Sequence, residues 1–564
     1  MIRSRVLAPT LALALLAGAA LPAMAQQVAQ PVAATASTER AAPALVVTLV
    51  IDQLSANLFN QYRSQFTGGL KTLADQGMVS INGYQTHGVT VTCAGHSTVL
   101  TGAHPTRSGI PANDWIDTTT GLKVYCLAAP QNTLAHGKNT DNGPVGPDQL
   151  KASTLGDWLK VVSPESRVFA ISGKDRGAIT LAGHQGDGAF WLTEGFGFTT
   201  YVEPGQSAAA KLAPVAAINA RMIDRFSRTA PIWNYQHDAC RRLEGQWVIG
   251  GQTFNSTLPP AQDDIEGSPL LDELTLEGAA DLLDNQQLGR RGVTDMLGVS
   301  LSATDRIGHG YGTQGPEMCE QMLRLDAALG VFLDKLATVP GGVVVVLTAD
   351  HGGSDFPERT SVEGYPAAGR VDPALMPRVN DALKAKFSLD ANPLVSSAGG
   401  LIVVGADHKS LAEPLRSQVL AAAVELLNGE PQVALAVSRD ELLAEPAPAS
   451  DNPEELSLRQ RLRLSAVAGR SPDIMRAYQP GLTGSGRVGG TLSSHGSPWD
   501  YDRRVPIIFW WPGANGQERF VPMRTIDIAP TLAHLIGVKP ADEVDGRCMD
   551  LPGFVAGRCE TPLP

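Results

Sequence analysis

Unbroken apolar runs that end in acidic residues or histidines recur along the chain. Residues 44–52 (ALVVTLVID), 297–309 (LGVSLSATDRIGH) and 343–351 (VVVVLTADH) share this pattern. Continuous apolar runs of this length are typical of parallel strands that are buried on both faces. Because open α/β sheets bind ligands at the carboxyl ends of their strands, we expect the polar residues that end these runs to lie together.

Helical periodicity occupies stretches between the apolar runs. A helix is expected to begin at Pro316, because apolar residues then recur at spacings of three and four as far as Leu336. Residues 268–289 have a second helical pattern, and a further helix is expected to begin just after Thr92. The alternation of strands and helices predicts an α/β fold: a doubly wound, mostly parallel sheet with helices on both faces.

Three stretches interrupt this alternation and are predicted to be inserted cap elements. Residues 105–150 are rich in Gly, Pro, Asn and Thr and are expected to form loops over the site. Residues 190–265 are expected to be irregular, with scattered aromatic side chains. Residues 355–490 contain a strand, a helix and another strand, predicted to form a βαβ element near one edge of the sheet. We therefore expect one catalytic domain, residues 43–564, with these three insertions.

The N-terminus has the pattern of a secretory signal peptide. Two arginines precede a short apolar run (LALALLAGAALP), and residues 23–25 (AMA) form an A-x-A cleavage signal. We therefore expect residues 1–25 to be removed by cleavage after Ala25, and residues 26–42 to form a flexible leader. No later run is long and apolar enough to span a membrane. The mature protein is predicted to be periplasmic or secreted, without a membrane span.

Composition narrows the classes of partner. The chain has 564 residues, a formal net charge of −12 and no basic run, which argues against nucleic acid or an anionic membrane as the main partner. The sequence contains no nucleic-acid-binding motif, and it leaves the oligomeric state open.

Six cysteines in an exported chain are expected to form disulfides. Cys548 and Cys559 lie in one loop-rich tail and are expected to pair. The other four could form two more bridges, and their spacing leaves the connectivity open. These four are Cys93, Cys126, Cys240 and Cys319.

Six residues are candidate metal ligands. Five of them end or follow the apolar runs, and the sixth stands in the later motif SSHGSPWD. They are three carboxylates and three imidazoles: Asp52, Asp305, His309, Asp350, His351 and His495. This mixture suits two zinc ions, each with three protein ligands and an open position for chemistry. Ligand type favours zinc without separating it from manganese or cobalt. We assign no role to the remaining histidines, among them His87, His96, His104 and His534.

A hydroxyl nucleophile is predicted at Thr92, in the run VTVTCAGHST. A threonine at a helix N-terminus faces free backbone N–H groups and the positive end of the helix dipole, which favour a phosphate or an alkoxide. Taken alone, Thr92 could simply cap its helix, and Thr90 is a rival two positions earlier. The thiol of Cys93 is the alternative nucleophile in the same run.

Several motifs, in this order, resemble those of the alkaline phosphatase superfamily: TVTCAGHSTVLTGAHPTRSGIPANDW, ISGKDR, SATDRIGHGYG, TADHGG and SSHGSPWDYDRRVPIIFW. Within it, the chain is similar to the bacterial periplasmic phosphatases of the PafA/PhoK type, and the resemblance covers nearly the whole mature chain. It implies that one zinc ion is bound by Asp305, His309 and His495. It implies that the second is bound by Asp52, Asp350, His351 and the oxygen of Thr92.

The resemblance also implies the phosphate-binding residues and the reaction. Asn113, Lys174 and Arg176 match residues that contact the oxygens of the transferred phosphoryl group, although alone the first could be a turn and the others a solvated loop. The substrates would be small phosphate monoesters, hydrolysed through a covalent phosphothreonine on Thr92. A structural calcium ion is a further implied cofactor, for which the sequence offers no EF-hand-like loop.

Four alternatives compete with this interpretation. A phosphodiesterase or nucleotide pyrophosphatase of the same superfamily shares the metal ligands, but it typically has a neutral pocket where Lys174 and Arg176 stand. A sulfatase needs a Cys/Ser-x-Pro-x-Arg motif, which Cys93 does not begin. A cofactor-independent phosphoglycerate mutase would be cytosolic, and a non-catalytic binding protein would need neither six ligands nor a hydroxyl. The two fixed cations favour monoesters over diesters.

Overall fold

The computed structural model describes residues 40–117, 119–137, 142–193, 197–228, 231–260, 265–484, 486–554 and 559. The predicted signal peptide, residues 1–25, lies outside them, as does all but the end of the predicted leader. At that end, the backbone N–H of Arg40 donates to the carbonyl of Gly553 at 2.9 Å. No helix in the described part of the chain has the length and apolar character needed to cross a membrane.

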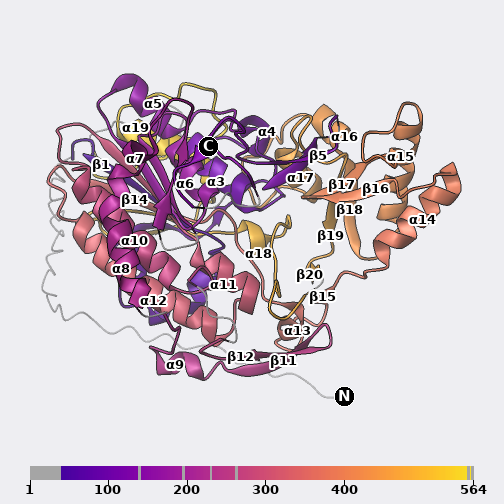
Figure 1. The fold of residues 1–564 in the computed structure, drawn as a ribbon, viewed down its shortest axis with the longest axis horizontal. Helices are drawn as coiled ribbons and strands as arrows, with labels where there is room; N and C mark the ends of the chain where they lie inside the picture. The colour runs from indigo at the N-terminus through magenta and orange to yellow at the C-terminus, as the bar shows by residue number, and fades with distance from the viewer. Residues whose placement is uncertain are drawn as a thin grey trace, which may run out of the picture. The chain divides into compact units, whose positions relative to one another are not determined.

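A nine-stranded sheet forms the centre of the fold, in the order β22-β2-β21-β14-β1-β13-β7-β8-β9. Figure 1 labels two of its central strands, β1 and β14. Five neighbouring strands are parallel: β14 (Val343–Thr348), β1 (Leu45–Ile51), β13 (Asp295–Leu301), β7 (Val168–Ser172) and β8 (Gly188–Thr193). Strands β9 (Gly197–Thr199) and β21 (Ile507–Trp510) flank them in antiparallel orientation, and β2 (Met78–Ser80) and β22 (Gln517–Arg519) follow β21. The predicted mostly parallel α/β sheet is confirmed.

Helices cover both faces of this sheet, because the side chains of each strand alternate between two hydrophobic cores. In β1, Val47, Leu49 and Ile51 belong to one core, and Val46 and Val50 belong to the other. The first core includes α10 (Leu270–Asn285) and α12 (Pro316–Leu336), and the second includes α3 (Thr92–Thr101), α6 (Asp175–Ala182) and α19 (Ile528–Leu535). Burial on both faces explains why the central strands are unbroken apolar runs.

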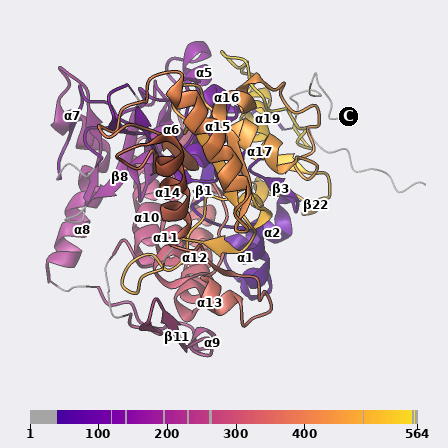
Figure 2. The same ribbon diagram turned by 90° about the vertical axis from the view of Figure 1, so that its right-hand side faces the viewer.

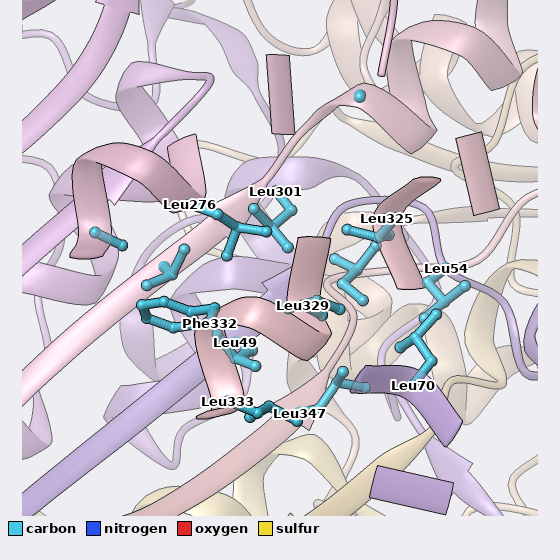
Figure 3. Packing of buried hydrophobic residues seen from close by; sticks show 14 of the residues in the cluster. Leu49, Leu54, Leu70, Leu276, Leu301, Leu325, Leu329, Phe332, Leu333 and Leu347 are labelled. Atoms are coloured by element: carbon cyan, nitrogen blue, oxygen red, sulfur yellow. The ribbon is translucent and has the colours of Figure 1, made fainter. Parts of the chain in front are cut away.

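Helix α12 shows how the predicted periodicity builds the first core. All of its predicted core-facing residues are buried: Met318, Met322, Leu325, Leu329, Phe332 and Leu336. Figure 3 shows Leu329 and Phe332 of this helix near Leu49 of β1, within one cluster of buried side chains. The predicted start of the helix at Pro316 is confirmed.

Residues 355–490 contain a second sheet with a hydrophobic core of its own. Its order is β16 (Leu394–Ser397), β17 (Gly400–Val403), β19 (Ile474–Tyr478) and β18 (Val433–Ser438), and all neighbours are antiparallel. Helices α14 (Leu375–Phe387) and α15 (Leu415–Asn428) contribute to its core and lie side by side (Figure 2). The predicted strand–helix–strand element is β17, α15 and β18, but β19 lies between its two strands.

The predicted irregularity of residues 190–265 was wrong. Strands β8 and β9 form one edge of the main sheet, α8 (Ala216–Arg228) is a helix, and β11 (Gly245–Ile249) pairs with β12 (Gln252–Ser256). These elements are short or largely solvent-exposed, so they lack the long apolar runs from which buried elements are predicted. Residues 105–150 likewise contain an antiparallel hairpin, β4 (Asp114–Asp117) and β5 (Leu122–Tyr125).

Candidate active site

The predicted metal ligands follow three adjacent strands. Asp52 comes directly after β1, Asp350 comes shortly after β14, and Asp305 lies in the first turn of α11 (Ala303–Tyr311), which follows β13. Since β13, β1 and β14 are neighbouring parallel strands, their carboxyl ends meet and bring the three buried carboxylates together. His495 enters the site from the loop before α18 (Asp500–Arg503).

The potential ligand atoms form two overlapping groups. One group contains Asp52, Asp350 and His351, and the other contains Asp305, His351 and His495; within each, the ligand atoms lie within 4.8 Å of one another. The Nε2 atoms of His309 and His495 lie 3.3 and 3.4 Å from Asp305 Oδ1. The structure therefore brings the six residues together, with His351 common to both groups and its ring stacked on that of His495 at 3.6 Å between centroids.

The imidazole orientations suit bound cations. Each Nδ1 atom lies 2.8 Å from a backbone carbonyl oxygen: His309 from Ser493, His351 from Gly352, and His495 from Thr90. A carbonyl can only accept a hydrogen bond, so each Nδ1 carries the proton and each Nε2 presents its lone pair to the carboxylates. Asp52 Oδ1 and His351 Nε2 are buried 3.4 Å apart, and neither has a hydrogen-bond partner in the described chain. Such unpaired buried atoms are costly, and a metal ion between them would satisfy both.

Negative charge is in excess at this site. Three buried carboxylates lie here, and two of them contact the ammonium of Lys174, whose Nζ lies 2.6 Å from Asp52 Oδ2 and also contacts Asp305. Burial alone would raise the pKa of Asp305, but the charges of Lys174 and His309 hold that pKa well below its ordinary value. Burial, together with the charge of Asp52, raises the pKa of Asp350 to about 6. Cations bound among these groups would neutralise the excess charge.

The structure distinguishes the two candidate threonines. Thr92 is the first residue of α3 and follows Val91, whose backbone is extended. The Thr90 hydroxyl donates to the carbonyl of Ser497 at 2.7 Å, and the Thr90 carbonyl accepts from His495 Nδ1. Thr90 therefore supports the loop that carries a ligand, which leaves Thr92 as the candidate nucleophile of this run.

Asn113 is held beside Thr92 by its side-chain oxygen. Asn113 Oδ1 accepts a hydrogen bond from the backbone N–H of Cys93 at 2.8 Å. Because the oxygen is used in this way, the hydrogens of the amide nitrogen remain to donate to an anion. The carbonyl of Asn113 accepts in turn from the N–H of Cys126 at 2.9 Å.

All six cysteines are paired in disulfides. The predicted pair, Cys548 with Cys559, is confirmed, and the connectivity that the spacing left open is Cys93 with Cys126 and Cys240 with Cys319. Since no cysteine is free, the structure excludes a thiol nucleophile at Cys93 and the formylglycine that a sulfatase would make from it.

Lys174 and Arg176 lie at the start of α6, just after β7. Together with Asp305 and His309 they line a cavity of about 950 Å³, whose far wall includes β12 and residues 488–491. The Arg176 side chain is 19% exposed and so can reach a ligand there. The volume is that of a pocket for a whole small molecule, so it would hold both the phosphate and the alcohol part of the expected monoester substrate.

Four residues that support this site were not among the predicted site residues. Gln53 donates through Nε2 to Asp305 Oδ1 at 3.0 Å and through its backbone N–H to Asp350 Oδ1 at 3.1 Å. His96, which we assigned no role, places Nδ1 3.0 Å from Asp350 Oδ2. The Tyr125 hydroxyl and the Arg176 N–H both donate to Asp175 Oδ1 at 2.8 Å. None of these contacts follows a spacing rule, and the signals that the sequence offered were positional: Gln53 directly follows Asp52, and Asp175 lies between Lys174 and Arg176.

Comparison with known proteins identifies the family. Residues 46–497 match the family model described as type I phosphodiesterase / nucleotide pyrophosphatase. The alkaline phosphatase PhoK of a Sphingomonas species is 38% identical to this chain over 97% of its length and 98% of the relative. The chain belongs to the alkaline phosphatases of this family.

Further relatives of this alkaline phosphatase agree. The alkaline phosphatase PhoD of Zymomonas mobilis is 36% identical over 91% of this chain and 89% of the relative. The crystal structure of the alkaline phosphatase PafA matches with a TM-score of 0.75 at 27% identity, covering 88% of this chain and 96% of that one. A second PafA structure, with the same figures, carries substitutions of one threonine, one asparagine, one lysine and one arginine.

These relatives bear out the resemblance predicted from the motifs. The family model covers phosphodiesterases, but the relatives that match nearly the whole chain are named as alkaline phosphatases. The protein is therefore a phosphatase that acts on phosphate monoesters, with the PafA-like α/β fold. Phosphatases of this family depend on metal ions, and the two ligand groups are where this chain would bind them.

Proposed function

We propose that this alkaline phosphatase is a periplasmic or secreted zinc enzyme that hydrolyses phosphate monoesters through a phosphothreonine on Thr92. One observation carries the proposal. Asp52 Oδ1 and His351 Nε2 are buried at the junction of two ligand groups without a hydrogen-bond partner among the described residues, and α3, which Thr92 begins, contacts Asp350 through His96. The N-terminal signal pattern supports export.

The first proposed metal site consists of Asp305, His309 and His495, and the second of Asp52, Asp350, His351 and the Thr92 oxygen. The mixture of nitrogen and oxygen ligands supports zinc. Two bound zinc ions would supply Lewis acidity to the attacking and leaving oxygens of the reaction. Calcium is a further cofactor that the resemblance implied, and we assign no residues to it.

Thr92 forms and then releases the covalent bond to phosphorus. Its hydroxyl oxygen attacks in line, the bond from phosphorus to the alcohol oxygen breaks, and the alcohol departs with the bonding electron pair and takes up a proton. Water then attacks phosphorus from the vacated side, the bond from phosphorus to the Thr92 oxygen breaks, that oxygen regains a proton, and inorganic phosphate leaves. Because Thr92 begins a helix, the N–H groups and dipole of α3 favour negative charge at this position.

Asn113, Lys174 and Arg176 bind the non-bridging oxygens of the phosphoryl group. The amide hydrogens of Asn113 and the two cations are donors that match a dianion, so they favour monoesters, whereas a diester would leave the cations partly unmatched. The PafA variant supports this assignment. Its substituted asparagine follows the threonine at the same spacing as in this chain, and its lysine and arginine are likewise separated by one residue.

A substrate panel with three variants tests the proposal. The metal-loaded protein should hydrolyse p-nitrophenyl phosphate much faster than bis-p-nitrophenyl phosphate and should leave p-nitrophenyl sulfate intact. Thr92→Ala should lose roughly 10³-fold or more in kcat while it still binds zinc and phosphate. Thr92→Ser should keep substantial activity, and acid quenching during turnover should trap phosphate on the peptide that contains Thr92.

The matched control is Thr90→Val, which removes a hydroxyl two positions away without removing the proposed nucleophile. It should still form the phosphoenzyme on Thr92, and any loss should appear in zinc affinity, because the Thr90 hydroxyl supports the loop of His495. Full activity in Thr92→Ala, or in protein without a transition metal, would overturn the proposal. Faster cleavage of the diester would favour the remaining alternative, a phosphodiesterase or nucleotide pyrophosphatase.

A further inference from the structure

A second cavity lies between the second sheet and the loop that carries His495. Its volume is about 390 Å³, at the lower end of the range for small-molecule sites. His495, Ser493 and Ser494 line one part, and Arg476 and Tyr478 of β19 line another. Thr491 lines both this cavity and the larger one beside Arg176, so the two cavities adjoin at that residue.

Arg476 is partly buried in this cavity without an acidic partner. Its guanidinium lies 4.4 Å from the ring centroid of Tyr478, and Nη1 lies 3.4 Å from Met376 Sδ. In the described part of the chain, no carboxylate lies within ion-pair distance of it. Burial lowers its pKa, which reflects the cost of holding this charge away from water. A charge held in this way is compensated when a ligand supplies the counter-charge.

The neighbouring arginines differ from Arg476 in this respect. Arg416 and Arg439 both form ion pairs with Asp473, which lies just before β19. Arg370, which also lines the cavity, pairs with Glu358 at 2.8 Å and donates to the carbonyls of Gly484 and Leu492. Their donors are thus already engaged, and Arg476 is the arginine of this cavity that is left to bind an anion.

The other polar groups of the cavity are compatible with an anion. Serine residues 397, 493, 494 and 497 contribute to its lining. Among the described lining residues, Asp502 is the only one with a carboxylate. It accepts hydrogen bonds from the backbone N–H and the hydroxyl of Ser497 at 2.8 and 2.6 Å. Burial raises the pKa of Asp502 to about 6. Its Oδ2 is engaged by Ser497, its buried Oδ1 has no hydrogen-bond partner in the described chain, and it forms no ion pair with Arg476 there.

We propose that this cavity is a subsite for a second anionic group, a carboxylate or a phosphate, on the alcohol part of the substrate, with Arg476 as its binding residue. The inference rests on the proposed function: the second metal site includes the attacking Thr92 oxygen, which leaves the site that contains His495 for the leaving alcohol oxygen. Arginine binds carboxylate and phosphate oxygens with two parallel N–H donors. The preferred substrates are then phosphate monoesters of acidic alcohols, such as phosphorylated hydroxy acids and bisphosphates.

Matched pairs of substrates test this subsite. The pairs are phenyl phosphate with 3-carboxyphenyl phosphate, and glycerol 1-phosphate with 3-phosphoglycerate, and kcat/KM is measured for each. Arg476→Met keeps the aliphatic packing against Tyr478 and removes the charge. It should lower kcat/KM for the carboxylated member of a pair by roughly 10-fold or more, and for the neutral member by less than about 2-fold.

Two further variants keep the test decisive. Arg378→Met removes an equal charge from the surface of α14, where Arg378 pairs with Asp372 and Glu430, and should leave the ratio within each pair unchanged. Arg476→Lys keeps the charge but not the paired donors and should be intermediate. If Arg476→Met lowers the thermal unfolding midpoint, Arg476→Lys takes its place as the test.

The possible outcomes separate the subsite from the reaction itself. An unchanged ratio with normal turnover of the neutral esters would overturn the subsite alone. If the wild-type protein, fully loaded with zinc, did not hydrolyse the neutral esters, the proposed function itself would be overturned. If Arg476→Met weakened inhibition by inorganic phosphate and left both substrate ratios unchanged, the cavity would bind free phosphate, and the substrate subsite would be wrong.

Discussion

Replacing Arg176 by leucine should separate monoesters from diesters. A charge-assisted hydrogen bond contributes roughly 1.5–3 kcal/mol, and an arginine can donate two of them to a dianion. The Arg176 side chain is 19% exposed, so solvent screens part of this energy. We therefore expect a loss of about 3 kcal/mol, or roughly 150-fold in kcat/KM, for p-nitrophenyl phosphate. The diester, with one less charge, should lose about 10-fold or less.

The assay compares kcat/KM for both esters on protein with full zinc content. Arg306→Leu is the matched control, because Arg306 lines the same cavity but is paired with Glu266 at 3.0 Å. That variant should change both esters by the same small factor. The assignment of Arg176 to the phosphoryl oxygens is wrong if Arg176→Leu weakens both esters equally, or if the monoester falls less than the diester.

Four other predictions follow from the described contacts. Chelation should abolish turnover and zinc should restore it, with His495→Ala losing zinc as severely as Asp305→Ala in elemental analysis. His96→Gln should weaken zinc binding roughly 10- to 100-fold in competition with a chelator, because Asp350 loses its contact at 3.0 Å. Replacing both Cys93 and Cys126 by serine should lower kcat as well as stability, whereas the same change at Cys548 and Cys559 should leave kcat unchanged. The hydrogen bond to Asp157 raises the pKa of His184, so its stabilising effect is fully present below about pH 6.5 and lost as pH rises through the folded value. The unfolding temperatures of wild type and His184→Gln should therefore differ more at about pH 5.5 than at about pH 8.5.

The central sheet could be predicted well because strands buried on both faces are encoded by continuous apolar segments of the sequence. Strands β1 and β14 are continuous apolar runs, and α12 has its buried residues at helical spacing. The second sheet was harder, since β17 and β19 are far apart in the chain and nothing in either segment encodes their pairing. Edge strand β9 has three residues, too few to show a pattern.

The residues of the candidate site likewise fall into those that a local sequence pattern predicts and those that it does not. Proposed ligands such as Asp52 and Asp350 end or closely follow recognisable strands, and the motifs connect them to a family. The residues that orient the ligands, Gln53 and His96, act through contacts between segments remote in sequence. Such contacts depend on how α3 packs against the sheet, which no local pattern determines. The unpaired state of Arg476 is likewise visible only once its neighbours are placed.

The disulfide between Cys93 and Cys126 has a consequence for when the enzyme becomes active. It joins the residue after Thr92 to the residue after Tyr125, so it ties the start of α3 to the hairpin that supports Arg176. Disulfides of this kind form after export and not in the reducing cytosol. We therefore expect the newly made chain to remain a weak catalyst until oxidation completes its maturation. With the export proposed above, the phosphorylated metabolites of the producing cell would be protected by the low activity of the unoxidised enzyme as well as by the membrane.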